Sequence, residues 1–210
     1  MPFEYSCFIS FRHSKHKLLQ KFVENIYDHL STFLSVYKKN VFLDRESLKN
    51  GDLLNESIAF NLCHSAFMVM IYTPDYLDEN HTWCAREYKA MLRLEQERLK
   101  LWTSNYDRNH GLIIPIIYSQ YGPLLSELKE RLFIDFSKLM MTKPKYAQTK
   151  SFHQELFNLA ETINERCDKL NYLGDLCKDC DNFTLPEENE IKLWIKSKSL
   201  QSKKQPLPRQ

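Results

Sequence analysis

Glycine is scarce in this chain, and its scarcity excludes two common ways of binding a nucleotide. The 210 residues include only four glycines, Gly51, Gly111, Gly122 and Gly174. No two of them have the spacing of G-x-G-x-x-G or G-x-x-x-x-G-K-[ST], so the Rossmann fingerprint and the P-loop are both absent. Any nucleotide that the protein binds must be held without a glycine-rich phosphate loop.

Long apolar runs and a strong excess of charge are also lacking. The longest apolar runs, 66–72 and 112–118, are far shorter than the roughly 20 residues of a membrane span. Twenty-nine basic and 27 acidic residues leave a net charge of +2, which argues against coating nucleic acid or an anionic membrane. Residues 1–5 show no basic region followed by an apolar stretch, as a signal peptide has. We therefore expect a cytoplasmic protein with neither a membrane nor a nucleic-acid partner.

The six cysteines favour buried thiols over disulfides or metal ligands. Cys7, Cys63 and Cys84 lie in or beside apolar segments, as buried free thiols do. Without a secretion signal, we expect the chain to be reduced. Cys177-x-x-Cys180 has no second C-x-x-C to complete a zinc site, so it predicts a turn with two incidental thiols and no metal.

Short apolar runs alternate with helical periodicity along most of the chain. Strands are predicted at residues 5–11, 41–43, 66–72, 112–117 and 133–136. Pro115 indicates an edge position or a bulge, and Ser151 is the expected cap of a last long helix. The alternation predicts an α/β fold in which five parallel strands form a doubly wound sheet.

Ligands bind such sheets outside the carboxyl ends of the strands, so the segments that follow the strands are the candidates for a site. Ser10-Phe11-Arg12 ends the first strand, and residues 44–52 follow the second. Trp83 and Glu87 follow the third and share one face of a helix, four residues apart. Taken singly, these are an ordinary strand end, a solvated turn, and a core tryptophan beside a solvated glutamate.

Three motifs occur in order along the chain. They are Phe8-Ile9-Ser10-Phe11-Arg12, then Phe42-Leu43-Asp44-Arg45-Glu46-x-Leu48-x-x-Gly51, then Ser65 to Tyr72 with Tyr76 and Trp83-Cys84-x-x-Glu87. Together they resemble box 1, the BB loop and the glutamate-bearing helix of the Toll/interleukin-1 receptor (TIR) domain family. The resemblance covers roughly residues 3–170, and it implies a flavodoxin-like fold.

The Trp-x-x-x-Glu arrangement is typical of family members that cleave NAD+. The resemblance therefore implies an NAD+ nucleosidase, a glycohydrolase or ADP-ribosyl cyclase, with NAD+ as substrate and no cofactor. It implies that Glu87 is catalytic. The implied substrate-binding residues are Ser10, Phe11, Arg12, Asp44, Arg45, Glu46, Leu48, Gly51 and Trp83.

The resemblance also implies a setting for the activity. It divides the chain into a TIR domain, residues 1–170, and an extension, residues 171–210, with a short helix and a disordered basic end from residue 196. The layout resembles bacterial antiviral systems, in which TIR domains self-assemble and pass ADP-ribose or a cyclic isomer to a separate effector or sensor. The alternative is a scaffold or virulence factor that acts only through TIR–TIR contacts.

Overall fold

Five parallel strands form one sheet in the order β2-β1-β3-β4-β5. The computed structural model describes residues 3–43, 53–101, 110–119, 128, 130–142, 145–174, 176–177 and 179–202, and only the backbone of 141–142 and 199–202. The strands are β1 (Tyr5–Phe11), β2 (Asn40–Leu43), β3 (Ser65–Tyr72), β4 (Ile113–Ile117) and β5 (Ile134–Asp135). This strand order is that of flavodoxin-like folds, so the predicted fold class is confirmed.

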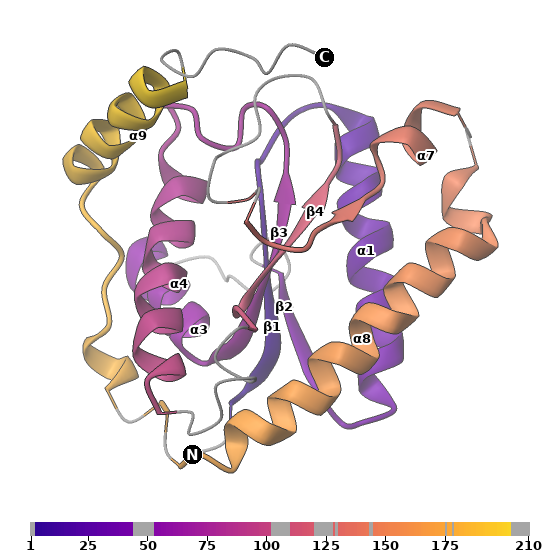
Figure 1. Ribbon diagram of the computed structural model, residues 1–210, viewed down its shortest axis with the longest axis horizontal. Coiled ribbons are helices and arrows are strands. Elements are labelled where there is room, and N and C mark those ends of the chain that lie inside the picture. The colour runs from indigo at the N-terminus through magenta and orange to yellow at the C-terminus, as the bar shows by residue number, and fades with distance from the viewer. Residues whose placement is uncertain are drawn as a thin grey trace.

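Helices cover both faces of the sheet (Figure 1), which is why β3 is buried along its whole length. On one face lie α1 (Lys17–Ser35) and α8 (Lys150–Asn171), and on the other α3 (Leu54–Cys63) and α4 (Trp83–Leu99). The short elements are α7 (Ser137–Thr142), η1 (Tyr146–Gln148) and η2 (Cys180–Asn182). Within the described residues, no helix is long and apolar enough to cross a membrane.

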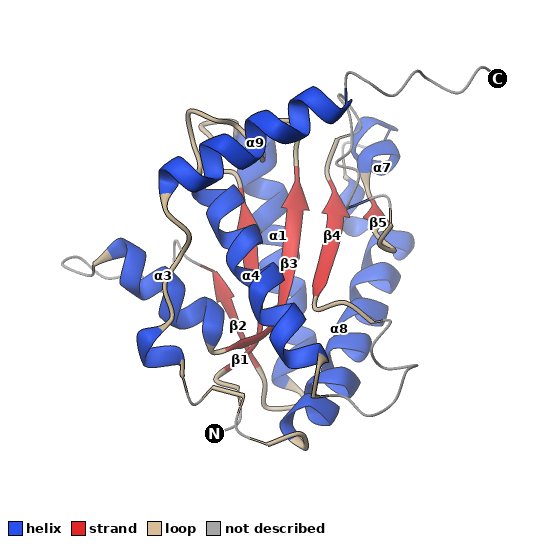
Figure 2. Ribbon diagram, turned by 60° about the vertical axis from the view of Figure 1, so that its left-hand side comes forward, coloured by secondary structure: helices blue, strands red, loops and turns tan. Residues whose placement is uncertain are grey.

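The C-terminal segment forms α9 (Glu188–Ser202), which packs on the outer side of α4 (Figure 2). Ile191 and Ile195 bury against Ala85, and the Trp194 ring lies 6.1 Å from that of Tyr88. Residues 196–202 are therefore helical, and the expectation that they belong to a disordered end is wrong. An apolar stripe with a partner on α4 stabilises a helix in spite of its lysines.

Two local predictions are also corrected. Pro115 marks neither an edge strand nor a bulge, because β4 pairs with β5 on one side and in unbroken register with β3 on the other. The pairs between β4 and β5 begin at Ile116, so Pro115 needs no N–H toward β5. The cap of α8 is Thr149, whose side chain accepts from the Phe152 N–H, and not Ser151. Both Thr149 and Ser151 have the hydroxyl that a cap needs, and the fold selects the one whose backbone is extended.

Cys63 and Cys180 form a disulfide across 117 positions of the sequence, so the expectation that both are free thiols is wrong. Cys63 ends α3, and Cys180 opens η2, which packs against that helix. The bond joins the C-terminal segment to the body of the domain. Cys7, Cys84, Cys167 and Cys177 are outside the disulfide and buried, as the sequence predicted for Cys7 and Cys84.

Candidate active site

The candidate site lies where the chain leaves two adjacent strands in opposite directions. β1 and β3 are neighbours, but β1 leads to α1 on one face and β3 leads toward α4 on the other. Parallel sheets of this kind open a crevice at such a point, outside the carboxyl ends of the two strands. Ser10, Phe11 and Arg12 leave β1 here, and Trp83 and Glu87 enter on the first turns of α4.

Ser10 and Glu87 are in direct contact. The Ser10 hydroxyl donates to Oε2 of Glu87 at 2.5 Å, and the Tyr76 hydroxyl lies 2.5 Å from the same Ser10 oxygen. A serine hydroxyl has one hydrogen, so Tyr76 donates to Ser10 while Ser10 donates to Glu87. The three side chains form a buried chain of hydrogen bonds that ends on a carboxylate. Glu87 is only 4% exposed, which excludes the interpretation of it as a solvated surface residue.

Tyr76 is a site residue that the sequence analysis did not assign. It is fully buried in the segment after β3, where its N–H donates to the Thr73 carbonyl in a turn. Burial, and next the nearby Cys84 and Glu87, hold the pKa of Tyr76 well above its ordinary value of 10. It is therefore a neutral donor at any physiological pH. Its place in the third motif, four residues after the carboxyl end of β3, was the signal for it.

Trp83 lies one turn before Glu87 and is partly buried. The Arg86 guanidinium sits over its indole at 4.8 Å, a cation–π arrangement. The Arg86 Nε–H in turn donates to the Pro186 carbonyl of the C-terminal segment at 2.7 Å. Trp83 is thus held between the core of the domain and an arginine that the extension engages.

Phe11 and Arg12 differ in their availability to a ligand. Phe11 is 4% exposed, its ring stacks on His13 at 4.6 Å, and its carbonyl accepts from the Cys84 thiol. Arg12 reaches Asp78 at 3.6 Å, and both side chains are partly open to solvent. A pair of this kind is worth under about 1 kcal/mol, so an anionic ligand can displace Asp78 at little cost.

The remaining predicted substrate-binding residues lie outside the described part of the chain. They are Asp44, Arg45, Glu46, Leu48 and Gly51. The structure therefore brings together Ser10, Glu87 and Tyr76 by direct contact, with Phe11, Arg12 and Trp83 around them. Among the described residues, no group of three or more His, Cys, Asp or Glu side chains is placed to hold a metal ion.

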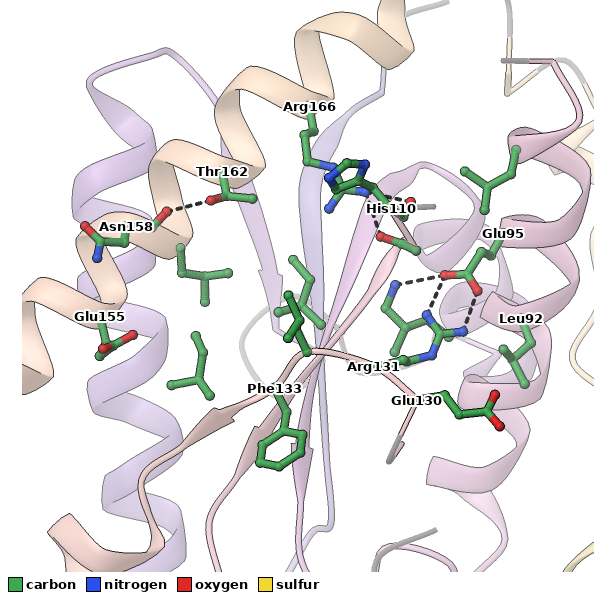
Figure 3. A pocket seen from close by; sticks show the side chains of 17 residues that line it. Leu92, Glu95, His110, Glu130, Arg131, Phe133, Glu155, Asn158, Thr162 and Arg166 are labelled. Carbon is green, nitrogen blue, oxygen red and sulfur yellow. Dashed lines mark hydrogen bonds and ion pairs between the residues drawn. The ribbon is translucent and has the colours of Figure 1, made fainter. Parts of the chain in front are cut away.

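A separate cavity of about 690 Å³ lies at the amino end of β4, between α4, α8 and the residues around β5 (Figure 3). Two charged side chains that line it already bind each other, because Arg131 donates to both carboxylate oxygens of Glu95. Arg166 donates to the His110 and Gly111 carbonyls. None of the predicted site residues lines this cavity.

Comparison with known families agrees with the motifs. The family profile described as TIR domain matches residues 7–150, which is more than half of the chain. The chain belongs to the TIR domain family. The match includes β1 from Cys7 onward, all of α4 and every residue of the candidate site.

This TIR domain protein is also similar to a solved structure. A solved structure of the TIR domains of the activated Roq1 resistosome, which directly recognises the pathogen effector XopQ, is 18% identical. The similarity covers 92% of this chain and 98% of that one, with a TM-score of 0.35. No curated protein matches the sequence. The family match ends at residue 150, so the boundary at residue 170 stays a prediction.

Proposed function

We propose that this TIR domain cleaves NAD+ at the bond between nicotinamide and ribose. One observation carries the proposal: a buried carboxylate, Glu87 on α4, lies beside the carboxyl end of β1, where Ser10 donates a hydrogen bond to it. A carboxylate with an oriented oxygen beside the carboxyl ends of the strands is the group that this reaction requires. Membership of a family that includes NAD-cleaving enzymes supports the same conclusion.

The chemistry needs little more than that carboxylate. The nicotinamide ring is already cationic in NAD+, so it departs as a neutral molecule and needs no general acid. Positive charge then develops on the ribose, as in glycoside hydrolysis. Glu87 stabilises that charge and accepts hydrogen bonds from the ribose hydroxyls. In the proposal, Ser10 and Tyr76 fix the carboxylate so that it need not reorganise as the bond breaks.

The neighbouring side chains have supporting roles in this proposal. Trp83 packs its indole face against the ribose, and Phe11, which is buried and stacked on His13, supports the strand end without an open ring face. Arg12 exchanges Asp78 for the diphosphate of NAD+, for which an arginine fork is well shaped. For Asp44 to Gly51 the proposal rests on the family resemblance alone, which implies a role in substrate binding or in contacts with a neighbouring subunit.

The products and the biological setting belong to the same proposal. Capture of the ribose cation by water gives ADP-ribose, and capture by a group of the same nucleotide gives a cyclic isomer. We propose that the chain acts in the cytoplasm, assembles through TIR–TIR contacts, and signals in an antiviral response to a separate effector or sensor. NAD+ is the substrate, and no cofactor takes part.

The test is NAD+ consumption by concentrated wild-type protein beside Glu87→Ala, with the products separated by chromatography. We expect the variant to lose at least about 10²-fold in rate, since one electrostatic contact to a developing charge contributes on the order of 3 kcal/mol. Glu97→Ala is the matched control, because Glu97 is exposed on the same helix. Equal turnover by the wild type and Glu87→Ala would refute the proposal.

A second candidate function, a non-enzymatic scaffold, is favoured by the burial of Glu87. A carboxylate that is 4% exposed and bonded to Ser10 also suits a purely structural role. In that case Glu87→Ala changes stability and leaves no activity to lose, while substitutions between Asp44 and Gly51 abolish TIR–TIR binding. Sedimentation of the variants, run beside the NAD+ assay, separates the two functions.

A further inference from the structure

A third cysteine lies against the disulfide that holds the C-terminal segment. Cys177 is 4% exposed, and its sulfur lies 3.9 Å from the backbone carbonyl of Cys63, one of the two bonded residues. Cys180, the other bonded residue, is three positions further along the chain. All three cysteines are buried, and they lie where the start of the extension packs against the end of α3.

The turn between the two extension cysteines suits a second disulfide. The Cys180 N–H donates to the Cys177 carbonyl at 3.1 Å, which closes a four-residue turn. Such a turn brings its first and last Cα atoms within about 7 Å. Disulfides join Cα atoms that are about 4.4–6.8 Å apart, so a Cys177–Cys180 bond fits the same local backbone.

A buried cation stands beside this site. The Arg98 guanidinium donates to the Cys63 carbonyl at 2.6 Å and to the Ser65 carbonyl at 2.8 Å. Burial lowers the pKa of Arg98 to about 10, so it is still charged at neutral pH, and a negative charge on Cys177 favours the charged guanidinium. The attraction is mutual, so Arg98 offsets part of the free-energy cost that burial imposes on a Cys177 thiolate, the species that attacks a disulfide.

We propose that Cys63, Cys177 and Cys180 form a thiol–disulfide exchange site that determines whether the extension is tied to α3. The Cys177 thiol gives its proton to solvent, and its thiolate attacks the Cys180 sulfur. The Cys177–Cys180 bond forms, the Cys63–Cys180 bond breaks, and the Cys63 thiolate takes up a proton. The number of disulfides is unchanged, so no oxidant or reductant is consumed.

The exchange changes what holds the extension in place. With Cys63 bonded to Cys180, the segment that leads to α9 is covalently fastened to α3. After exchange the bond lies within the extension's own turn. The segment is then held by the apolar patch under α9, by the Arg86–Pro186 hydrogen bond, and by partly exposed ion pairs such as Arg93–Glu190, which contribute little. The proposal does not depend on the chemistry at Glu87.

The experiment traps the sulfur that exchange releases. The 210-residue chain, purified without added thiol, is incubated at pH 8 with N-ethylmaleimide, and labelled and disulfide-linked peptides are identified by tandem mass spectrometry. Trypsin cleaves after Lys178 and so separates Cys177 from Cys180. In the wild type we expect Cys63 to become labelled as the Cys177–Cys180 peptide pair appears. In Cys177→Ser, Cys63 should be labelled at least tenfold more slowly.

Two further measurements make the result decisive. Cys167→Ala removes a buried thiol on α8 outside this cluster, and it should label Cys63 at the wild-type rate. Hydrogen exchange of residues 188–202 should accelerate in step with Cys63 labelling in the wild type and not in Cys177→Ser. Equal labelling of Cys63 in the wild type and Cys177→Ser, no labelling in either, or protein without a Cys63–Cys180 bond would each overturn the proposal.

Discussion

Replacing Ser10 with alanine should destabilise the domain more than any change of that size elsewhere in β1. The substitution removes one oxygen, which donates to Glu87 and accepts from Tyr76. The lost charge-assisted hydrogen bond contributes about 1.5–3 kcal/mol, and removing the acceptor of a fully buried tyrosine hydroxyl costs a further 1–3 kcal/mol or so. We expect Ser10→Ala to lower the free energy of unfolding by about 3–5 kcal/mol in urea titrations.

Tyr76→Phe is the matched control, because it removes only the far end of the same chain of hydrogen bonds. Ser10 still donates to Glu87, so the cost should be about 1 kcal/mol. In the double variant, Ser10→Ala no longer leaves a buried hydroxyl without its acceptor. The double variant should therefore cost less than the sum of the single ones by about 1–2 kcal/mol. If Tyr76→Phe costs as much as Ser10→Ala, or if the two effects add, the proposed direction of the hydrogen bonds is wrong.

Three further predictions concern stability. Burial raises the pKa of Cys7 from 9 to about 12, so the thiol ionises at lower pH in the unfolded chain than in the folded one. The free energy of unfolding, measured with urea, should therefore fall from pH 9 to 12. In Cys7→Ala the slope should be smaller by up to about 1.4 kcal/mol per pH unit. Reducing the Cys63–Cys180 bond opens a loop of 117 residues and should lower the free energy of unfolding by about 4–5 kcal/mol, measured with and without dithiothreitol. Glu95→Gln should lower the free energy of unfolding by about 2–3 kcal/mol in denaturant titrations, because it removes the charge that pairs with the partly buried Arg131 guanidinium, whereas exposed Glu97→Gln should stay within about 0.5 kcal/mol.

The sequence predicted the sheet well where a strand is a continuous apolar run. The predicted bounds of β1 agree with the structure, and those of β3 differ by one residue, because both strands are buried on two faces and consist mostly of apolar residues. β5 proved shorter than predicted, at Ile134–Asp135. Its flanks are equally apolar, and only pairing with β4 decides which residues count as strand. The cap at Thr149 instead of Ser151 is the same kind of local ambiguity.

The site was predictable in composition but not in its contacts. Helical spacing places Trp83 and Glu87 on one face, and the strand end supplies Ser10, yet the Ser10–Glu87 bond spans 77 positions. No local pattern encodes such a contact, because the crossing of β1 and α4 in space determines it. The disulfide was even less predictable from local sequence. Whether Cys63 pairs with Cys180 or with Cys177 depends on how the extension packs against α3.

Two adjacent residues of α4 contact different parts of the protein: Glu87 contacts β1, and Arg86 contacts the extension. This limits how the extension can act on the site. Glu87 points inward to Ser10, while Arg86, one position earlier, bonds to Pro186 and covers Trp83. Release of the extension therefore breaks the Arg86–Pro186 hydrogen bond and leaves Arg86 free to move off the Trp83 indole. The Ser10 hydrogen bond to the Glu87 carboxylate stays in place. An effect of the extension on ligand binding should appear at Trp83, with Glu87 still hydrogen-bonded to Ser10.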